Sequence, residues 1–184
     1  VAAFVILADL IFRDKRILPI IAVLGLLIPG YFSVALSMAD QSTGFFGTFK
    51  LDGFSLFFKY LILGSTATVI LLSNEYAKRF ENHQGEYYAL ILLSASGMML
   101  LASCVELITL YISLELTALP LVALSAFLRN PRSAESGVKF LILSAISSAI
   151  LLYGMVLIYG LTGTSQLPEI AEQLSEMTFA SHPA

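Results

Sequence analysis

Long apolar stretches separated by short polar breaks make up most of this chain, and this pattern limits what it can fold into. Residues 17–38 and 107–127 are two such stretches. A bilayer core of about 30 Å takes about 20 helical residues to cross, whereas a membrane-spanning strand needs only about 9–11. In lipid, every backbone polar group must be hydrogen-bonded within the protein. The lengths therefore predict membrane-spanning helices and exclude a β-barrel.

The composition also indicates that the chain lies in a lipid bilayer. Of the 184 residues, 58% are hydrophobic and 12% are charged, while soluble domains carry about 25% charged residues. The net charge of −3 leaves no basic surface for nucleic acid, so no nucleic-acid partner is expected. The single cysteine, Cys104, cannot form an intrachain disulfide or supply the thiolates of an iron–sulfur cluster. The expected surroundings are the lipid bilayer.

Six apolar segments predict an all-α, polytopic transmembrane helical bundle with about six spans over residues 1–163. The expected spans cover residues 1–12 (truncated), 17–38, 54–72, 87–103, 107–127 and 136–159. Residues 164–184 are predicted to form a polar tail, with one short amphipathic helix in its PEIAEQLSEM stretch. The first segment is too short to span and the chain stops in polar sequence, so we expect a fragment of a longer protein.

The basic residues predict the orientation of the bundle. Those of the first, third and fifth breaks are Arg13, Lys15, Arg16, Lys78, Arg79, Arg129 and Arg132. The second break holds only Lys50. Cytoplasmic loops of membrane proteins are enriched in Lys and Arg. The N-terminus and the tail are therefore expected on the outer side of the membrane.

Glu115 lies inside the 107–127 stretch, roughly 12 Å from its start and roughly 18 Å from its end. A charge at the centre of a spanning helix is unfavourable by about 2.5–3.5 kcal/mol. The carboxyl is therefore protonated, faces a polar cavity, or pairs with a cation from another helix. We predict a protonatable relay site, against the alternative of a neutral carboxyl that only packs. Pro120 leaves the carbonyl of Leu116 without its helical donor, which could bend the helix and admit water.

Lys139 is the second candidate, near the start of the 136–159 stretch. Its long stem could carry the ammonium to the headgroups, and Glu135 stands four residues earlier in the favourable orientation for a surface pair. Spacing alone favours this surface interpretation. By helical rise, Lys139 lies about 9 Å nearer the cytoplasm than Glu115, so direct pairing requires bending or water. Small residues suggest close helix contacts in two spans: Ser94, Ala95, Ser96 and Gly97, and Ser144, Ala145, Ser147, Ser148, Ala149 and Gly154.

No motif for cofactor chemistry occurs in the chain. It has no Gly-rich phosphate loop, no paired nucleophile and base, and no nucleotide fingerprint. Both histidines, His83 and His182, lie outside the spans, so metal and haem sites are unsupported. We expect no cofactor bound by this chain.

Three segments resemble the subunit N family of bacterial complex I, NADH:quinone oxidoreductase. They are LDGFSLFFKYLIL (51–63), YISLELTALPLVALSAF (111–127) and the stretch 133–163. The most specific part is Glu-Leu-x-x-Leu-Pro-Leu at Glu115, followed by Glu-x-x-x-Lys-Phe from Glu135. The resemblance covers nearly the whole chain.

The resemblance implies a proton-translocating membrane subunit of this translocase, in the bacterial inner (plasma) membrane. In the family, a glutamate on the fifth span and lysines on later spans form a charged axis, which makes Glu115 and Lys139 the residues of proton translocation here. No redox centre is expected in this chain; NADH, FMN, iron–sulfur clusters and quinone belong to partner subunits. The expected partners are the other membrane subunits of complex I. The family has more spans than this chain, so its proton path would be incomplete here.

Alternatives remain at this point. The large subunits of multi-subunit cation/proton antiporters share the helix pattern and exchange sodium for protons without an electron donor. A membrane-bound hydrogenase and the plastoquinone-reducing relative of photosynthetic membranes are rivals within the redox class. The last alternative is a purely structural helical bundle, in which Glu115 stays neutral throughout.

Overall fold

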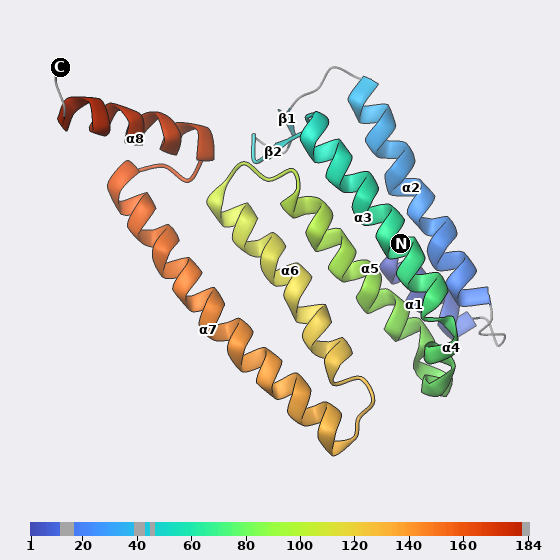
Figure 1. The fold of residues 1–184 in the computed structure, drawn as a ribbon. Helices are drawn as coiled ribbons and strands as arrows, with labels where there is room; N and C mark the ends of the chain where they lie inside the picture. The colour runs from blue at the N-terminus through green and yellow to red at the C-terminus, as the bar shows by residue number, and fades with distance from the viewer. Residues whose placement is uncertain (12–16, 39–42, 45–46, 182–184) are drawn as a thin grey trace.

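The computed structural model describes residues 1–11, 17–38, 43–44 and 47–181, and it is a helical bundle (Figure 1). The main helices are α1 (Ala2–Ile11), α2 (Leu18–Met38), α3 (Gly53–Leu72), α5 (Gln84–Leu101), α6 (Leu107–Ser125), α7 (Pro131–Thr162) and α8 (Leu167–Ser181). Short elements are β1 (Thr43–Gly44), β2 (Phe49–Lys50), α4 (Asn74–Ala77) and the 3-10 helix η2 (Lys78–His83). The predicted all-α bundle is confirmed.

Four helices among the described residues are long and apolar enough to cross a membrane: α2, α3, α6 and α7. The other two expected spans differ from these. Helix α1 has 10 residues, about 15 Å, which is half of the hydrocarbon thickness. Helix α5 has 18 residues but begins with the polar Gln84 and Glu86.

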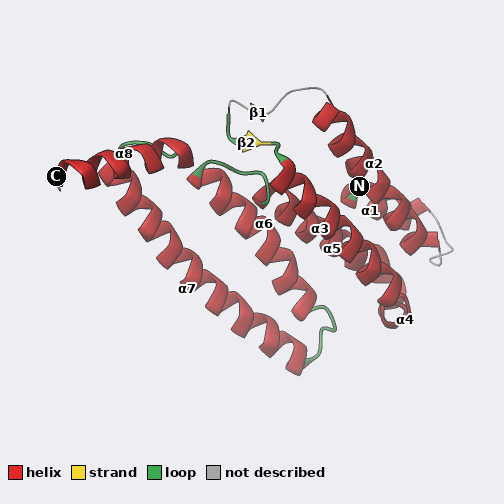
Figure 2. Cartoon of the chain, turned by 45° about the horizontal axis from the view of Figure 1, so that its top comes forward, coloured by secondary structure: helices red, strands yellow, loops and turns green. Residues whose placement is uncertain are grey.

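Helix α5 lies at the centre of the arrangement, packed against α1, α3 and α6. Helix α2 lies against α3, and α7 lies at the other edge, against α6 (Figures 1 and 2). The main core forms where α1, α2, α3 and α5 meet; Val5, Leu18, Ile70 and Tyr88 are each at most 1% exposed there. Each pair of successive helices from α5 to α7 is antiparallel because the connecting turns are short.

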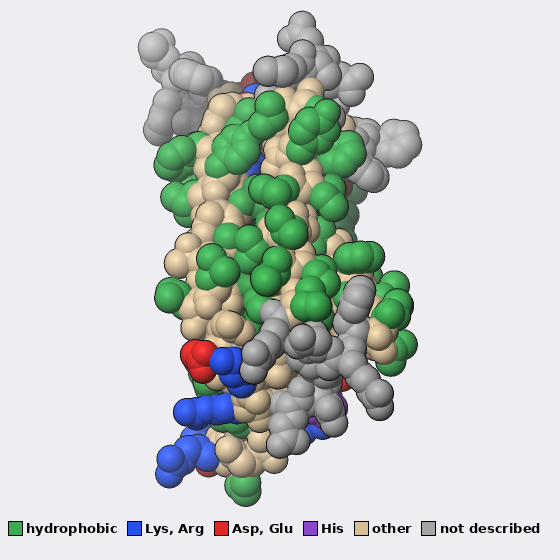
Figure 3. All heavy atoms as spheres, turned by 90° about the vertical axis from the view of Figure 1, so that its right-hand side faces the viewer, with side chains coloured by type: hydrophobic (Ala, Val, Ile, Leu, Met, Phe, Trp, Pro, Cys, Tyr) green, Lys and Arg blue, Asp and Glu red, His purple; other side chains and the backbone are tan. Residues whose placement is uncertain are grey.

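Large apolar side chains cover the outside of the bundle, as expected for helices that face lipid. Leu24, Leu27, Phe57 and Ile150 are each more than half exposed. Figure 3 shows a band of hydrophobic side chains along one face, with most of the visible Lys and Arg side chains gathered below it. The apolar band and the charged end match the surface of a membrane protein.

Several local elements were not predicted. The break at 73–86 is largely helical, since it contains α4 and η2. Helix α7 begins at Pro131, before the expected span, because the Asn130 side chain caps it by accepting a hydrogen bond from the Ser133 amide (2.8 Å). At its other end Gly163 adopts φ 71°, a left-handed conformation that favours glycine. The helix of the tail, by contrast, was predicted; it is longer than the PEIAEQLSEM stretch and runs over Leu167–Ser181.

A small backbone clasp joins three loops at one end of the bundle, called here the hairpin end. The loops are the β1–β2 hairpin, the α5–α6 turn and the α7–α8 loop. Their hydrogen bonds run from Lys50 N to Ser103 O (2.8 Å), Val105 N to Thr48 O (2.9 Å), Leu107 N to Ser165 O (2.9 Å) and Leu167 N to Val105 O (2.8 Å). The clasp fixes the start of α6. The opposite end, with the loop between α6 and α7, is called the turn end.

Candidate functional site

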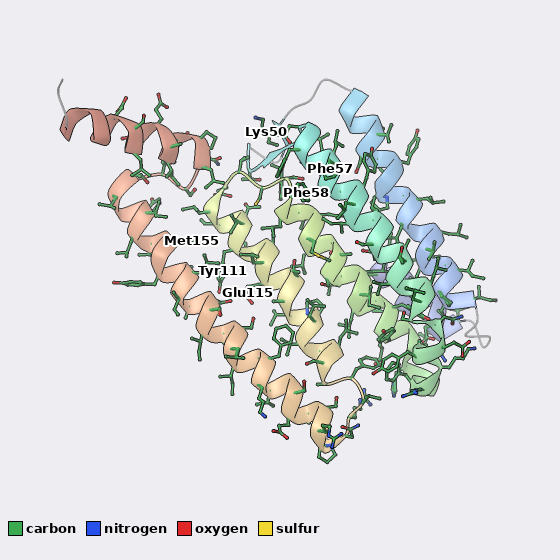
Figure 4. The ribbon with its side chains drawn as sticks, viewed as in Figure 1. Lys50, Phe57, Phe58, Tyr111, Glu115 and Met155 are labelled. Carbon is green, nitrogen blue, oxygen red and sulfur yellow. The ribbon has the colours of Figure 1, made fainter. Side chains whose placement is uncertain are left out.

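Glu115 lies in the middle of α6, half-buried, on the side that faces α7 (Figure 4). The hydroxyl of Ser148, on α7, donates a hydrogen bond to Oε1 of Glu115. Among the residues that the structure describes, no Lys, Arg or His forms an ion pair with Glu115. The partner from the neighbouring helix is thus a neutral hydroxyl, whereas the third predicted environment required a cation.

The seam between α6 and α7 explains why these two residues meet. Gly137 lies against Ala126, where an added Cβ would come within 2.7 Å of the Ala126 Cβ. Counting eleven residues back along α6 from Ala126 reaches Glu115, and eleven forward along α7 from Gly137 reaches Ser148. Antiparallel helices with the same rise keep this register. The turn geometry therefore places Ser148 opposite Glu115.

An apolar cluster closes the seam between Glu115 and the hairpin end. Leu107, Met155 and Ile170 are its buried members, and Leu110, Tyr111 and Leu167 pack against them. Tyr111 precedes Glu115 by about one helical turn, roughly 6 Å. Figure 4 shows Tyr111 and Glu115 in the space between the two helices, with Met155 further along α7. The first turn of α8 thus completes the cover over this part of the seam.

The turn-end half of the seam is more polar. The Ser133 hydroxyl donates to the Ser125 carbonyl oxygen at 2.9 Å. Ser144 is half-buried and lies one turn of α7 before Ser148. Small side chains and hydroxyls in this half contrast with the large apolar ones on the other side of Glu115.

Helix α5 packs closely against α6 at Leu116 and Thr117, within two residues of Glu115. A Cβ on Gly97 would meet the Thr117 amide nitrogen at 2.6 Å and the Leu116 carbonyl carbon at 2.9 Å, so the two backbones are in close contact. The Ser94 hydroxyl donates to the Thr117 carbonyl at 3.0 Å. The adjacent Leu116 carbonyl receives no hydrogen bond from residue 120, because Pro120 has no backbone N–H. This packing fixes the position of Glu115 from the side away from α7.

Lys139 does not meet Glu115. Its Nζ donates to Glu135 Oε1 at 2.5 Å, and the two side chains are 70% and 63% exposed. Ser148, at the level of Glu115, is nine residues further along α7, roughly 13 Å away. The geometry corresponds to the surface pair that spacing favoured.

Sequence reasoning did not single out Ser148 as a site residue, because it treated the serines of this span as a sign of close packing. Register supplies the missing signal: equal counts from the α6–α7 turn place one of these serines opposite the carboxylate. The described residues contain no group of three or more His, Cys, Asp or Glu that could hold a metal ion. Cys104, in the α5–α6 turn, donates through Sγ to the Leu101 carbonyl (3.2 Å), and burial raises the pKa of its thiol.

Comparison with known proteins identifies the family of this chain. A family model described as NADH:quinone oxidoreductase/Mrp antiporter, TM, matches residues 104–182, which contain Glu115, Lys139 and Ser148. The NADH-quinone oxidoreductase subunit N of Dehalococcoides mccartyi is 38% identical over 177 residues, 96% of this chain and 36% of that protein. The chain belongs to the subunit N family. The resemblance seen in the Glu115 motif is confirmed.

Further relatives agree with this membership. Subunit N of Moorella thermoacetica is 39% identical over 163 residues, 88% of this chain and 34% of that protein. The chain spans about a third of the length of the curated relatives it matches. Respiratory complex I from Thermus thermophilus with bound Aureothin contains a chain with a TM-score of 0.72 and 28% identity, covering 95% of this chain and 39% of that one. A chain of the membrane-bound sulfane sulfur reductase, an archaeal respiratory membrane complex, shares the fold with a TM-score of 0.71 and 24% identity, covering 93% of this chain and 37% of that one.

Proposed function

We propose that this member of the subunit N family is a proton-translocating membrane subunit of bacterial NADH:quinone oxidoreductase, in which Glu115 takes up and releases the proton. The observation that carries the proposal is a carboxyl in the middle of a spanning helix, with a hydroxyl from the adjacent span as its polar partner. Placing a charge there is unfavourable by about 2.5–3.5 kcal/mol. Membrane carboxylates at such positions mark proton relays.

The two halves of the seam favour one direction of proton exchange. The apolar cluster around Met155 excludes water from the hairpin end. In the turn-end half, Ser133 donates to the Ser125 carbonyl, and the half-buried Ser144 lies one turn of α7 before Ser148. Arg129 and Arg132 lie at the turn end, so the positive-inside rule puts it in the cytoplasm and the N-terminus on the outer side. Glu115 then exchanges its proton with the cytoplasmic side.

Lys139 is the second residue of the proposed path. Its pair with Glu135 lies on the turn-end half of α7, exposed rather than within the seam. An ammonium that moves toward Glu115 favours the charged carboxylate, and one that returns to Glu135 favours proton binding. Moving one proton outward against about 150 mV requires roughly 3.5 kcal/mol, which corresponds to roughly two to three factors of ten in proton affinity. A change in proton affinity of this size is what the motion of the one cation, Lys139, must supply.

The redox cofactors of such a complex, NADH, FMN, iron–sulfur clusters and quinone, belong to partner subunits. The proposed partners of this chain are the other membrane subunits of complex I and the bilayer. The match to a chain of respiratory complex I supports this assignment. The open apolar flank of α7, with Ile142, Leu143 and Ile146 all exposed, supplies surface for further membrane helices or lipid.

The test uses the full-length subunit in its native complex, in inverted membrane vesicles. Glu115→Gln removes the titratable group but keeps the size and a hydrogen-bond acceptor. We expect NADH-driven acidification and quinone reduction both to fall by at least about tenfold at equal complex content, as for loss of a relay group. Glu172→Gln, an exposed carboxylate of α8, is the control and should behave as wild type. Unchanged acidification in Glu115→Gln would contradict the proposal.

One observation favours a second function. The matching family model covers Mrp antiporters as well as NADH:quinone oxidoreductases. A cation/proton antiporter would move protons in response to a sodium gradient, without NADH. Vesicles that show sodium-driven and not NADH-driven proton movement would assign the chain to this class.

A further inference from the structure

The hydroxyl of Ser148, like that of Ser94, donates to a neighbouring helix and not within its own helix. Ser and Thr within a helix usually donate to the carbonyl three or four residues earlier. Thr66, Ser113, Thr117, Ser125 and Thr162 all do so. Ser148 instead donates across the seam to Glu115. The Ser148 hydroxyl therefore does not bond to the carbonyl of Ser144, four residues earlier in α7.

The position of Ser148 is set by the fold and not by the hydrogen bond alone. The contacts of α7 with α6 recur along one helical face, at Ser133, Gly137, Ser148 and Met155. The spacings of four, eleven and seven residues all keep one side of a helix toward its neighbour. Ser147, the adjacent residue, is exposed. Only one of the two serines can therefore reach the carboxyl.

We propose that Ser148 is a positioning residue for Glu115 that stays hydrogen-bonded to its carboxyl in both protonation states. The inference rests on the proposed function, in which Glu115 carries the proton. A serine hydroxyl has one O–H donor and two lone pairs. With the carboxylate, Ser148 donates to Oε1. When Glu115 gains a proton, the carboxyl O–H donates to Ser148 Oγ, and the Ser148 hydroxyl rotates to donate to the Ser144 carbonyl.

The proton inventory of this exchange balances. Glu115 gains one proton, which forms its O–H bond, and Ser148 keeps its own proton throughout. Only the direction of the hydrogen bond reverses. Ser148 remains the hydrogen-bond partner in both states, so the carboxyl stays between α6 and α7 while its charge changes.

The two hydrogen bonds differ in strength. A bond to a charged carboxylate is roughly twice as strong as one between neutral groups. Ser148 therefore stabilises the carboxylate more than the acid, and its removal should favour the protonated form. The pH dependence of pumping should then move to higher pH, by about tenfold in proton concentration for a bond of this class.

Three variants of the full-length subunit test this in the native complex. Ser148→Ala removes the hydroxyl, Ser148→Thr keeps it, and Ser147→Ala is the matched control one residue away on the exposed side. NADH-driven acidification is measured against pH in inverted vesicles at equal complex content. We expect Ser148→Ala to shift the profile to higher pH by about tenfold in proton concentration, and Ser148→Thr and Ser147→Ala to follow wild type.

The outcomes separate this inference from the proposed function. If Glu115→Gln abolishes acidification while Ser148→Ala keeps the wild-type pH profile, the role of Ser148 is wrong and that of Glu115 stands. If Ser148→Ala lowers the amount of assembled complex but leaves the profile of the remainder unchanged, Ser148 only packs. If Glu115→Gln has no effect, the proposed function itself fails.

Discussion

The close contact between α5 and α6 at Gly97 predicts that even a methyl group added there disturbs the site around Glu115. Gly97→Ala adds one methyl group, which would lie 2.6 Å from the Thr117 amide nitrogen, 2.6 Å from Thr117 Oγ1 and 2.9 Å from the Leu116 carbonyl carbon. Ordinary non-bonded carbon contacts are about 3.5–4.0 Å. Two of the three atoms are backbone and cannot rotate away. Helix α6 must therefore retreat by roughly 1 Å.

This retreat has two consequences. Overpacking of a closely packed contact destabilises by about 1–3 kcal/mol. The Ser94 hydroxyl, 3.0 Å from the Thr117 carbonyl, loses its partner as the helices separate. Glu115 is two residues away, so its hydrogen bond with Ser148 is displaced as well. We expect Gly97→Ala to lower both the thermal stability of the complex and its NADH-driven acidification.

The assay is thermal melting of the solubilised complex, followed by size-exclusion chromatography, together with acidification in vesicles. Gly154→Ala on α7 is the matched control, because its added methyl group meets no atom within 4 Å. It should melt like wild type. Equal melting temperatures for Gly97→Ala and Gly154→Ala would refute the argument that backbone contact at Gly97 positions α6.

Two further predictions concern the ends of the seam. Met155→Ser opens the apolar cluster to water, so we expect protons to leak across the vesicle membrane without NADH, measured as the decay of an imposed pH gradient. The control is the neighbouring Val156→Ser, at a 59% exposed position, which should not leak. Equal decay in both variants would contradict closure of the seam by the apolar cluster. Burial raises the pKa of the Cys104 thiol, so less of it is thiolate at a given pH, and N-ethylmaleimide should modify it more slowly at pH about 8 than after denaturation. Equal rates before and after denaturation would show that Cys104 is not shielded.

The helical architecture could be predicted because apolar length dominates it. The stretch 107–127 needs no tertiary information to be a helix, and α6 occupies most of it. The β1–β2 hairpin was missed because each strand has two residues, too few for an alternating pattern. The early start of α7 depends on the Asn130 cap, a local signal in Asn-Pro-Arg-Ser that span prediction by hydropathy ignores.

The candidate site was predicted in part. Glu115 stands out by charge alone, because its apolar surroundings in sequence leave few explanations. Its partner does not stand out, since Ser148 is one of several serines in its span and differs from Ser147 only by which side faces α6. The placement of Lys139 depends on which partner the side chain finds, and the nearby Glu135 is the one that it contacts. Pairings between helices require the register of the turn, which composition does not contain.

Infrared difference spectroscopy of the native complex tests the central claim most directly, because it detects protonation of a carboxyl group itself. Spectra during NADH-driven turnover are compared with those at rest, in wild type and in Glu115→Gln. The account predicts a protonated-carboxyl band that changes during turnover in wild type, is absent in Glu115→Gln, and is displaced in Ser148→Ala. Superimposable wild-type and Glu115→Gln spectra would show that Glu115 keeps its charge state during turnover, and would contradict the account.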